Sequence, residues 1–185
     1  MVTSRKENGS LRLKLNHTPQ DAKEPVVEFD LDFWSYNYPA LLVRHTTTNV
    51  SSQLIEDLKV YSIFDFDIGG PTSYKDDMGL YDEENNIIMA YDETGLAVAM
   101  STRPKPDGWE ISYPLRLKIE EASRDLKKNF EAGPKDIAIA LQSNISDLSP
   151  GESGSVEIII ASAQNLDEAR SLIGKSWGLF KKKIR

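Results

Sequence analysis

A two-residue alternation of apolar and polar side chains recurs along this chain and restricts the fold more than any other feature. Between residues 26 and 36, Val27, Phe29, Leu31 and Phe33 alternate with mostly acidic residues. Successive side chains of a β-strand point to opposite faces, so this pattern predicts a strand with one buried and one solvated face. Strands are expected at residues 11–15, 26–36, 41–48, 54–68, 87–91, 96–102, 137–142 and 156–161.

Two further segments have apolar residues at helical spacing. Residues 114–130 begin with a proline suited to a first helical turn and are followed by Gly133-Pro134, a stop signal. Residues 165–183 begin with Asn165, a good N-terminal cap, with Glu168 three positions later. We therefore expect a mainly β fold, an antiparallel β-sandwich with two α-helices. Residues 1–10 are polar and expected to be flexible, and residues 11–185 are expected to form a single domain.

The composition restricts the cellular environment and the classes of partner that we expect for this chain. The 185 residues include no cysteine, which excludes disulfides and thiolate metal sites and fits a reducing cytoplasm. Four glycosylation sequons, starting at Asn8, Asn16, Asn49 and Asn144, are interpreted as chance matches because no signal-peptide pattern precedes them. The net charge of −7 disfavours nucleic-acid binding, and no apolar run is long enough to span a bilayer. We expect a cytoplasmic protein without nucleic-acid or membrane partners.

The richest group of carboxylates contains Asp65, Asp67, Asp76, Asp77 and Asp82. Asp65 and Asp67 lie on the same face of a predicted strand, about 7 Å apart. Three interpretations stay open. The group is a solvated strand face with a polar loop, or it binds a hard cation such as Ca²⁺ through Asp65 and Asp67, or two of its members act as acid and base across a glycosidic bond.

Other catalytic patterns are weak. Gly69-Gly70-Pro71 is interpreted as a turn rather than a phosphate-binding loop, because no Gly-Lys-Ser/Thr ending follows it. There is no nucleophile-elbow pattern for a catalytic serine. The two histidines, His17 and His45, have no histidine partner at metal-ligand spacing, so we assign them structural roles.

Three aromatic residues are candidates for carbohydrate binding. Trp34 and Tyr36 end the polar face of the strand at residues 26–36, and Trp109 follows the turn-forming residues 106–108. Flat rings at such places can stack on the apolar face of a sugar. They can equally form the seat of a helix or of another domain, and this alternative also stays open.

Several segments in order resemble the N-terminal domain of prokaryotic and archaeal glucoamylases. Residues 60–70 (VYSIFDFDIGG) resemble one of its strands, and residues 79–82 (GLYD) with 86–91 (NIIMAY) resemble the hairpin that follows. Residues 136–141 (DIAIAL) and 148–153 (LSPGES) are similar to its last strands, and Ala161 with residues 166–172 (LDEARSL) to its exit helix. The resemblance covers residues 40–173 and implies a supersandwich of the galactose-mutarotase-like type.

The resemblance also shapes the functional expectation. The family's catalytic glutamates lie in a helical barrel beyond this domain, so no catalytic residue can be transferred to these 185 residues. We expect a non-catalytic carbohydrate-associated module that binds a glycan or supports a glycoside hydrolase catalytic domain in trans. The alternatives are a small mutarotase- or epimerase-like enzyme, in which His45 would be the only strand-borne histidine, and a structural subunit of a homo-oligomer.

Overall fold

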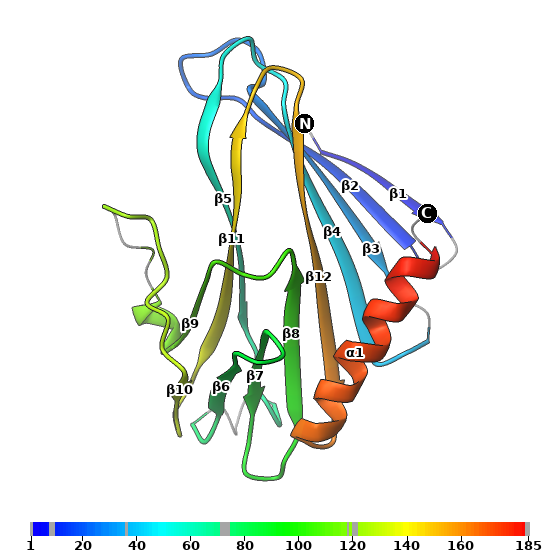
Figure 1. Cartoon of the computed structure of the whole chain (residues 1–185), viewed down its shortest axis with the longest axis vertical. Helices are drawn as coiled ribbons and strands as arrows, with labels where there is room; N and C mark the ends of the chain where they lie inside the picture. The colour runs from blue at the N-terminus through cyan, green and yellow to red at the C-terminus, as the bar shows by residue number, and fades with distance from the viewer. Residues whose placement is uncertain are drawn as a thin grey trace.

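The computed structural model describes residues 2–7, 10–35, 37–70, 75–117, 119 and 122–183, and these residues form two antiparallel sheets and one α-helix (Figure 1). Sheet A has the order β1 (Val2–Glu7), β2 (Ser10–His17), β3 (Val27–Trp34), β4 (Ala40–Asn49), β12 (Ser153–Ala163), β8 (Ala97–Arg103), β7 (Ile87–Tyr91), β6 (Met78–Asp82) and β10 (Glu131–Ala132). Sheet B has the order β5 (Ile55–Asp65), β11 (Ala138–Leu148) and β9 (Gly108–Ser112). The prediction of a mainly β fold with two antiparallel sheets is confirmed.

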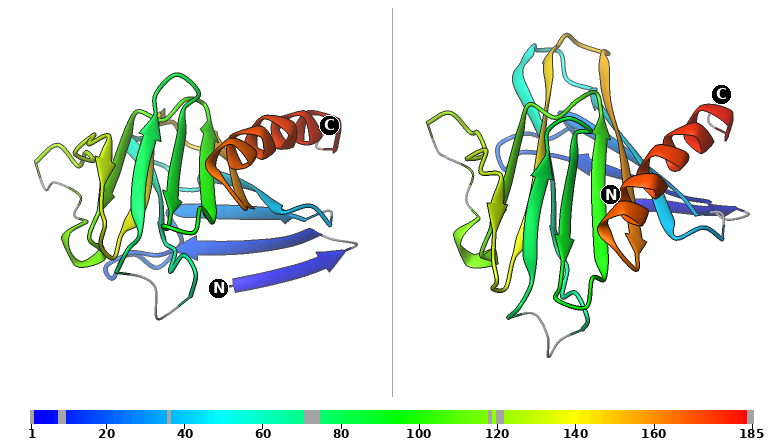
Figure 2. Two further views of the ribbon diagram at one scale, coloured as in Figure 1. Left: turned by 90° about the horizontal axis from the view of Figure 1, so that it is seen from below. Right: turned by 60° about the horizontal axis from the view of Figure 1, so that its bottom comes forward.

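The alternation seen in the sequence places the side chains of sheet A in two separate cores. In β7, Ile88 and Ala90 face sheet B, whereas Ile87 and Met89 lie on the opposite face beneath the helix. The same division follows β12, where Ile158 joins the inter-sheet core and Ile159 joins the core under the helix. These strands are apolar on both faces because sheet A is covered on both sides at its centre (Figure 2).

Helix α1 (Leu166–Lys183) covers the outer face of sheet A through Ala169, Ile173, Trp177 and Phe180. Its predicted start is confirmed. The Glu168 N–H donates to Asn165 Oδ1 at 2.9 Å, and the Gln164 N–H donates to Glu168 Oε2 at 3.1 Å, which forms a reciprocal cap. No helix within the described residues is both long enough and apolar enough to cross a membrane.

The predicted helix at residues 114–130 is wrong. Among the described residues of this range, the helical structure is a single 3-10 turn, η1 (Pro114–Arg116), and Arg124 and Lys128 have positive φ angles of 55° and 59°. The Asn129 side chain accepts from the Ile111 N–H at 3.0 Å and donates to the Ile111 carbonyl at 2.7 Å, so it satisfies the free edge of β9. Tertiary hydrogen bonds of this kind outweigh a weak helical propensity.

Among the described residues, side-chain alternation did not reveal β1, β6, β9 and β10, although the glucoamylase resemblance had indicated the hairpin that β6 and β7 form. Residues 2–7, expected to be flexible, pair with residues 10–15 of β2. Backbone pairing along a sheet needs no apolar side chains, so a polar strand of this kind leaves no alternation to detect. Strand β6 contains Gly79, and β9 directly follows a turn. Because turn-forming residues interrupt the alternation, neither strand could be recognised from the pattern.

Candidate functional site

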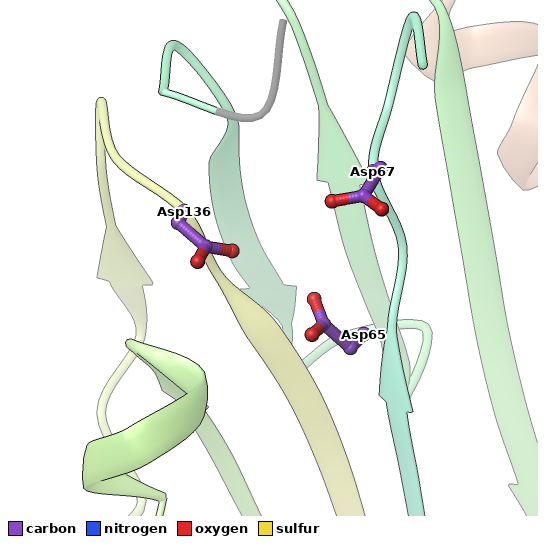
Figure 3. Close-up of side chains that lie close together, drawn as sticks. All are labelled: Asp65, Asp67 and Asp136. Carbon is purple, nitrogen blue, oxygen red and sulfur yellow. The ribbon is translucent and has the colours of Figure 1, made fainter. Parts of the chain in front are cut away.

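Three carboxylates meet at one end of the sandwich. Strand β5 ends at Asp65, the chain continues through Asp67, and Asp136 lies just before β11. Strands β5 and β11 are antiparallel with Ala138 opposite Asp65, so the register brings Asp136 alongside Asp67. The carboxylates of all three residues point into a common space, and one oxygen from each lies within 4.8 Å of the others (Figure 3).

The sequence predicted Asp65 and Asp67 but missed Asp136. The sequence showed that Asp136 precedes a strand. It did not show that this strand pairs with the strand that carries Asp65. Of the other predicted acids, Asp82 has partners outside this cluster. Asp82 pairs with Arg170 of α1, with Nε to Oδ2 at 3.0 Å, and accepts hydrogen bonds from Asn85.

The surroundings of the cluster favour protonation of its first member. Partial burial raises the pKa of Asp65, and the neighbouring charges of Asp136 and Asp67 raise it further. Positive side chains would reverse this effect, but in the described part of the chain no ion pair joins a lysine or arginine to any of the three. The cluster therefore carries an excess of negative charge.

Asp77 is a fourth acid in this region, and it is buried. Its residue is 1% exposed, and neither carboxylate oxygen has a hydrogen-bond partner of normal geometry among the described residues. Burial raises the pKa of Asp77 to about 6, the nearby Ile68 N–H opposes the shift, and the charges of Asp76, Asp67 and Asp92 add to it. An uncompensated buried carboxylate is costly and therefore uncommon.

A cleft of about 550 Å³ opens beside the cluster. Its walls come from the end of β5, the start of β8, the end of β12 and the first turns of α1. The cleft combines carboxylates from Asp65, Asp67 and Glu168 with the half-buried ring of Phe66, which stacks on Phe64 at a centroid distance of 5.3 Å. Apolar and aromatic walls with a few polar groups are typical of small-ligand sites.

His45 lies elsewhere, in a second groove of about 570 Å³ between the sheets. Its Nε2 is 3.2 Å from Thr47 Oγ1, its ring packs on Phe29 at 5.6 Å, and burial lowers its pKa. Among the described residues that line this groove, none is an aspartate or glutamate. The groove therefore does not bring His45 together with a carboxylate partner.

The predicted aromatic residues occupy different environments. Trp34 packs edge-on against Phe180 of α1 at 5.7 Å, in the position that a helix seat requires. Trp109 lies on β9, is 7% exposed and stacks on Tyr81 at 4.0 Å, so its ring faces the core. Tyr36 lies outside the described residues.

No protein-family model matches this chain, and no curated protein matches its sequence. Solved structures do match it. A bacterial glucoamylase in complex with acarbose superposes with a TM-score of 0.72 over 96% of this chain and 26% of that chain, at 16% identity. This chain has the galactose-mutarotase-like β-sandwich fold. It spans about a quarter of the length of that glucoamylase.

Two other structures share this fold. An aldose epimerase homologue from C. elegans superposes with a TM-score of 0.59, at 10% identity, over 89% of this chain and 69% of that one. A family GH92 alpha-mannosidase from Bacteroides thetaiotaomicron superposes with a TM-score of 0.53, at 14% identity, over 91% of this chain and 21% of that one. The resemblance predicted from the sequence is therefore confirmed at the level of the fold, and these neighbours are carbohydrate-active enzymes.

Proposed function

We propose that this chain is a non-catalytic module of carbohydrate metabolism that supports a glycoside hydrolase catalytic domain in trans. The observation that carries this proposal is the coverage of the glucoamylase match. Nearly the whole chain, 96%, corresponds to only 26% of that enzyme. The other three quarters of the glucoamylase have no counterpart in these residues, and in the proposed function a separate catalytic chain corresponds to them.

The arrangement of the acids supports a non-catalytic role. The oxygens of Asp65, Asp67 and Asp136 approach within 4.8 Å of one another. Carboxyl groups that flank a glycosidic bond stand roughly 5–9.5 Å apart to leave room for the sugar or a water molecule. His45 is in the other groove, without a carboxylate among the described lining residues. His45 therefore lacks, among the described lining residues, the carboxylate partner that epimerisation would need.

Exposed apolar side chains support a docking surface. Among the described residues, six large apolar side chains are exposed, and three of them, Leu115, Ile119 and Phe130, belong to residues 114–130. Leu115 is 78% exposed. Exposed apolar side chains that form a contiguous patch mark interaction sites, and we propose that these three contribute to one.

The trans-support proposal predicts binding to a glucoamylase barrel whose own N-terminal domain has been removed. The wild-type chain is expected to co-elute with this barrel in size-exclusion chromatography and to raise its melting temperature. Leu115→Asp is expected to weaken binding by at least about tenfold, as central apolar contacts do. Leu54→Asp is the matched control. Leu54 is also exposed, at 51%, but it lies just before β5 and outside residues 114–130. A wild-type chain that neither binds nor stabilises the barrel would contradict the proposal.

A second candidate function, glycan binding, is favoured by the cleft beside Asp65 and Asp67. Phe66 offers an aromatic surface there, and the carboxylates can accept hydrogen bonds from sugar hydroxyls. Affinity gel electrophoresis with soluble α-glucans is expected to retard the wild-type chain. Phe66→Ala is expected to reduce the retardation, with affinity lower by roughly five- to tenfold. Phe130→Ala, at a half-exposed phenylalanine outside the cleft, should leave it unchanged. Equal mobility with and without glucan would exclude this function.

A further inference from the structure

Sheet B has two edges, and in the described part of the chain only one of them is covered. Along β9, the Lys128 N–H donates to the Trp109 carbonyl at 2.8 Å, and the Asn129 side chain bonds both backbone groups of Ile111. Along β5, no described strand pairs with the outer edge, and no backbone hydrogen bond outside the β5–β11 ladder reaches residues 59–65. Because backbone groups point alternately to the two edges of a strand, about half of these residues offer an open N–H and C=O.

The groove of about 570 Å³ that contains His45, called the β5 groove below, lies beside this open edge and is only partly covered. Its floor is the inner face of sheet A. Val43 of β4 and Ile158 of β12 are each 6% exposed there. On β3 the same face carries three apolar side chains that are only half-buried, Phe29, Leu31 and Phe33. Burial therefore decreases from β12 toward β3, because sheet B ends at β5.

The uncovered floor and the open edge fit one added layer of extended chain. Strands β1 to β3 lie on the side of the molecule opposite β9 and β10 (Figures 1 and 2). Neighbouring strands stand roughly 4.8 Å apart, and packed sheets stand about 10 Å apart. A strand added beside β5 would pair with its open backbone groups and cover β3 at the same time. A helix would cover the apolar floor but leave the edge of β5 unpaired.

A second copy of this chain fits the β5 groove poorly. Antiparallel pairing of β5 with its own copy needs a twofold axis normal to sheet B, and such an axis keeps each layer in its own plane. Strands β1 to β3 of both copies would then compete for the same space beneath the joined edges. The formal net charge of −7 on each copy adds repulsion.

Exposed carboxylates at both ends of the open edge define the charge of a suitable partner. Glu56 and Asp57 lie at the start of β5, Asp65 ends it, and Asp67 follows shortly after. Arg124 pairs with Asp57. In the described part of the chain, no ion pair joins a lysine or arginine to Glu56, Asp65 or Asp67. Basic residues near both ends of a docking segment would complement these charges.

We propose that the β5 groove receives an extended segment of a partner chain, which adds a strand to sheet B beside β5. The segment presents apolar side chains at every second position to the floor of the groove and has a basic residue near each end. In strand addition, main-chain hydrogen bonds supply affinity and alternate side chains supply specificity. The inference goes beyond the proposed function, because it specifies the form of a docking segment and not the activity of the chain that carries it.

The test uses a capped nine-residue peptide in which valine and threonine alternate between two terminal lysines. Its fluorescein-labelled form is titrated with the full chain, and binding followed by anisotropy is expected to saturate below about 1 mM. Leu31→Asp, which puts a charge into the apolar floor, is expected to weaken binding by at least about tenfold. Leu115→Asp is the matched control and should bind as the wild type does, because Leu115 is exposed outside the groove.

Two altered peptides test the same points without any change to the chain. A proline at the central position removes a backbone N–H and cannot join a sheet interior, so binding is expected to fall by at least about tenfold. Glutamates in place of both lysines are expected to weaken binding by roughly three- to tenfold at low salt. Equal binding of the proline peptide, or no binding of the original peptide below about 1 mM, would overturn strand addition.

Amide hydrogen exchange locates the bound peptide. At saturation, the outward-facing amides among residues 59–65 are expected to exchange at least about tenfold more slowly, while the amide of Ile111, already bonded to Asn129, stays unchanged. Protection confined to residues 2–7, at an edge of sheet A, would contradict the assignment to β5. Sedimentation should show a monomer without peptide. A dimer that protects residues 59–65 would assign the groove to a second copy and overturn the proposal.

Discussion

Asp77→Asn is expected to raise the melting temperature by roughly 4–8 °C at pH 8 in EDTA, or about 2 kcal/mol of unfolding free energy. Most substitutions of buried residues destabilise, so a gain of this size would be diagnostic. Asp77 is 1% exposed and its oxygens have no hydrogen-bond partner of normal geometry among the described residues. Asparagine has almost the same shape and carries no charge, so it removes the cost of burying a carboxylate.

The gain should depend on pH in a defined direction. Burial raises the pKa of Asp77 from its ordinary value of 3.8 to about 6 in the folded chain. A raised pKa favours the protonated carboxyl in the folded state, so its contribution to stability is complete below pH 4 and is lost as the pH rises through 6. Wild type and Asp77→Asn should therefore be equally stable near pH 3.5 and diverge between pH 4 and 7. Melting curves across this range in EDTA measure the divergence.

Asp92→Asn is the control for this experiment. Asp92 is also buried, but its Oδ1 accepts hydrogen bonds from the Thr94 N–H at 3.0 Å and the Thr94 hydroxyl at 2.7 Å. Replacing a carboxylate that is already satisfied should destabilise by about 1 kcal/mol rather than stabilise. If Asp77→Asn also lowers stability at pH 8, the idea of an uncompensated buried charge at Asp77 is wrong.

The sequence predicted most of the strands, but it predicted the candidate site only in part. Strands β3, β4, β7, β8 and β12 were predicted within a few residues, because their side chains face a core on at least one side and therefore alternate or stay apolar. Helix α1 was also predictable, since its cap residues Asn165 and Glu168 act locally. The helix predicted at residues 114–130 failed because Asn129 binds the backbone of Ile111, which is a tertiary contact that spacing cannot reveal.

The candidate site also depends on tertiary contacts that spacing along the sequence cannot reveal. Asp65 and Asp67 could be paired from the two-residue period of one strand. Asp136 joined them only through the register of β5 with β11, and a single-residue slip would have moved it to the other face. Trp109 follows turn-forming residues in the sequence but lies in strand β9, whose start those residues concealed. Local patterns predict elements, whereas sites depend on which elements become neighbours.

Trp109→Ala is expected to cost about 3–5 kcal/mol of unfolding free energy, as other truncations of a buried tryptophan do. The ring stacks on Tyr81 at 4.0 Å and meets the edge of Phe130 at 5.5 Å, so its loss would leave a cavity between the sheets. Urea unfolding at pH 7 measures the change, and an unaltered m-value would show that the unfolded state is the same.

Trp109→Phe separates packing from hydrogen bonding at this position. The Trp109 Nε1 has no hydrogen-bond partner among the described residues, so a phenylalanine loses ring area but no hydrogen bond. It should cost about 1–2 kcal/mol, clearly less than alanine. Trp34→Ala, at a half-buried ring against Phe180, should fall between these values. A Trp109→Ala variant that keeps its stability but loses glucan binding would instead return Trp109 to the sugar-stacking role, because only an exposed ring can be removed without leaving a cavity.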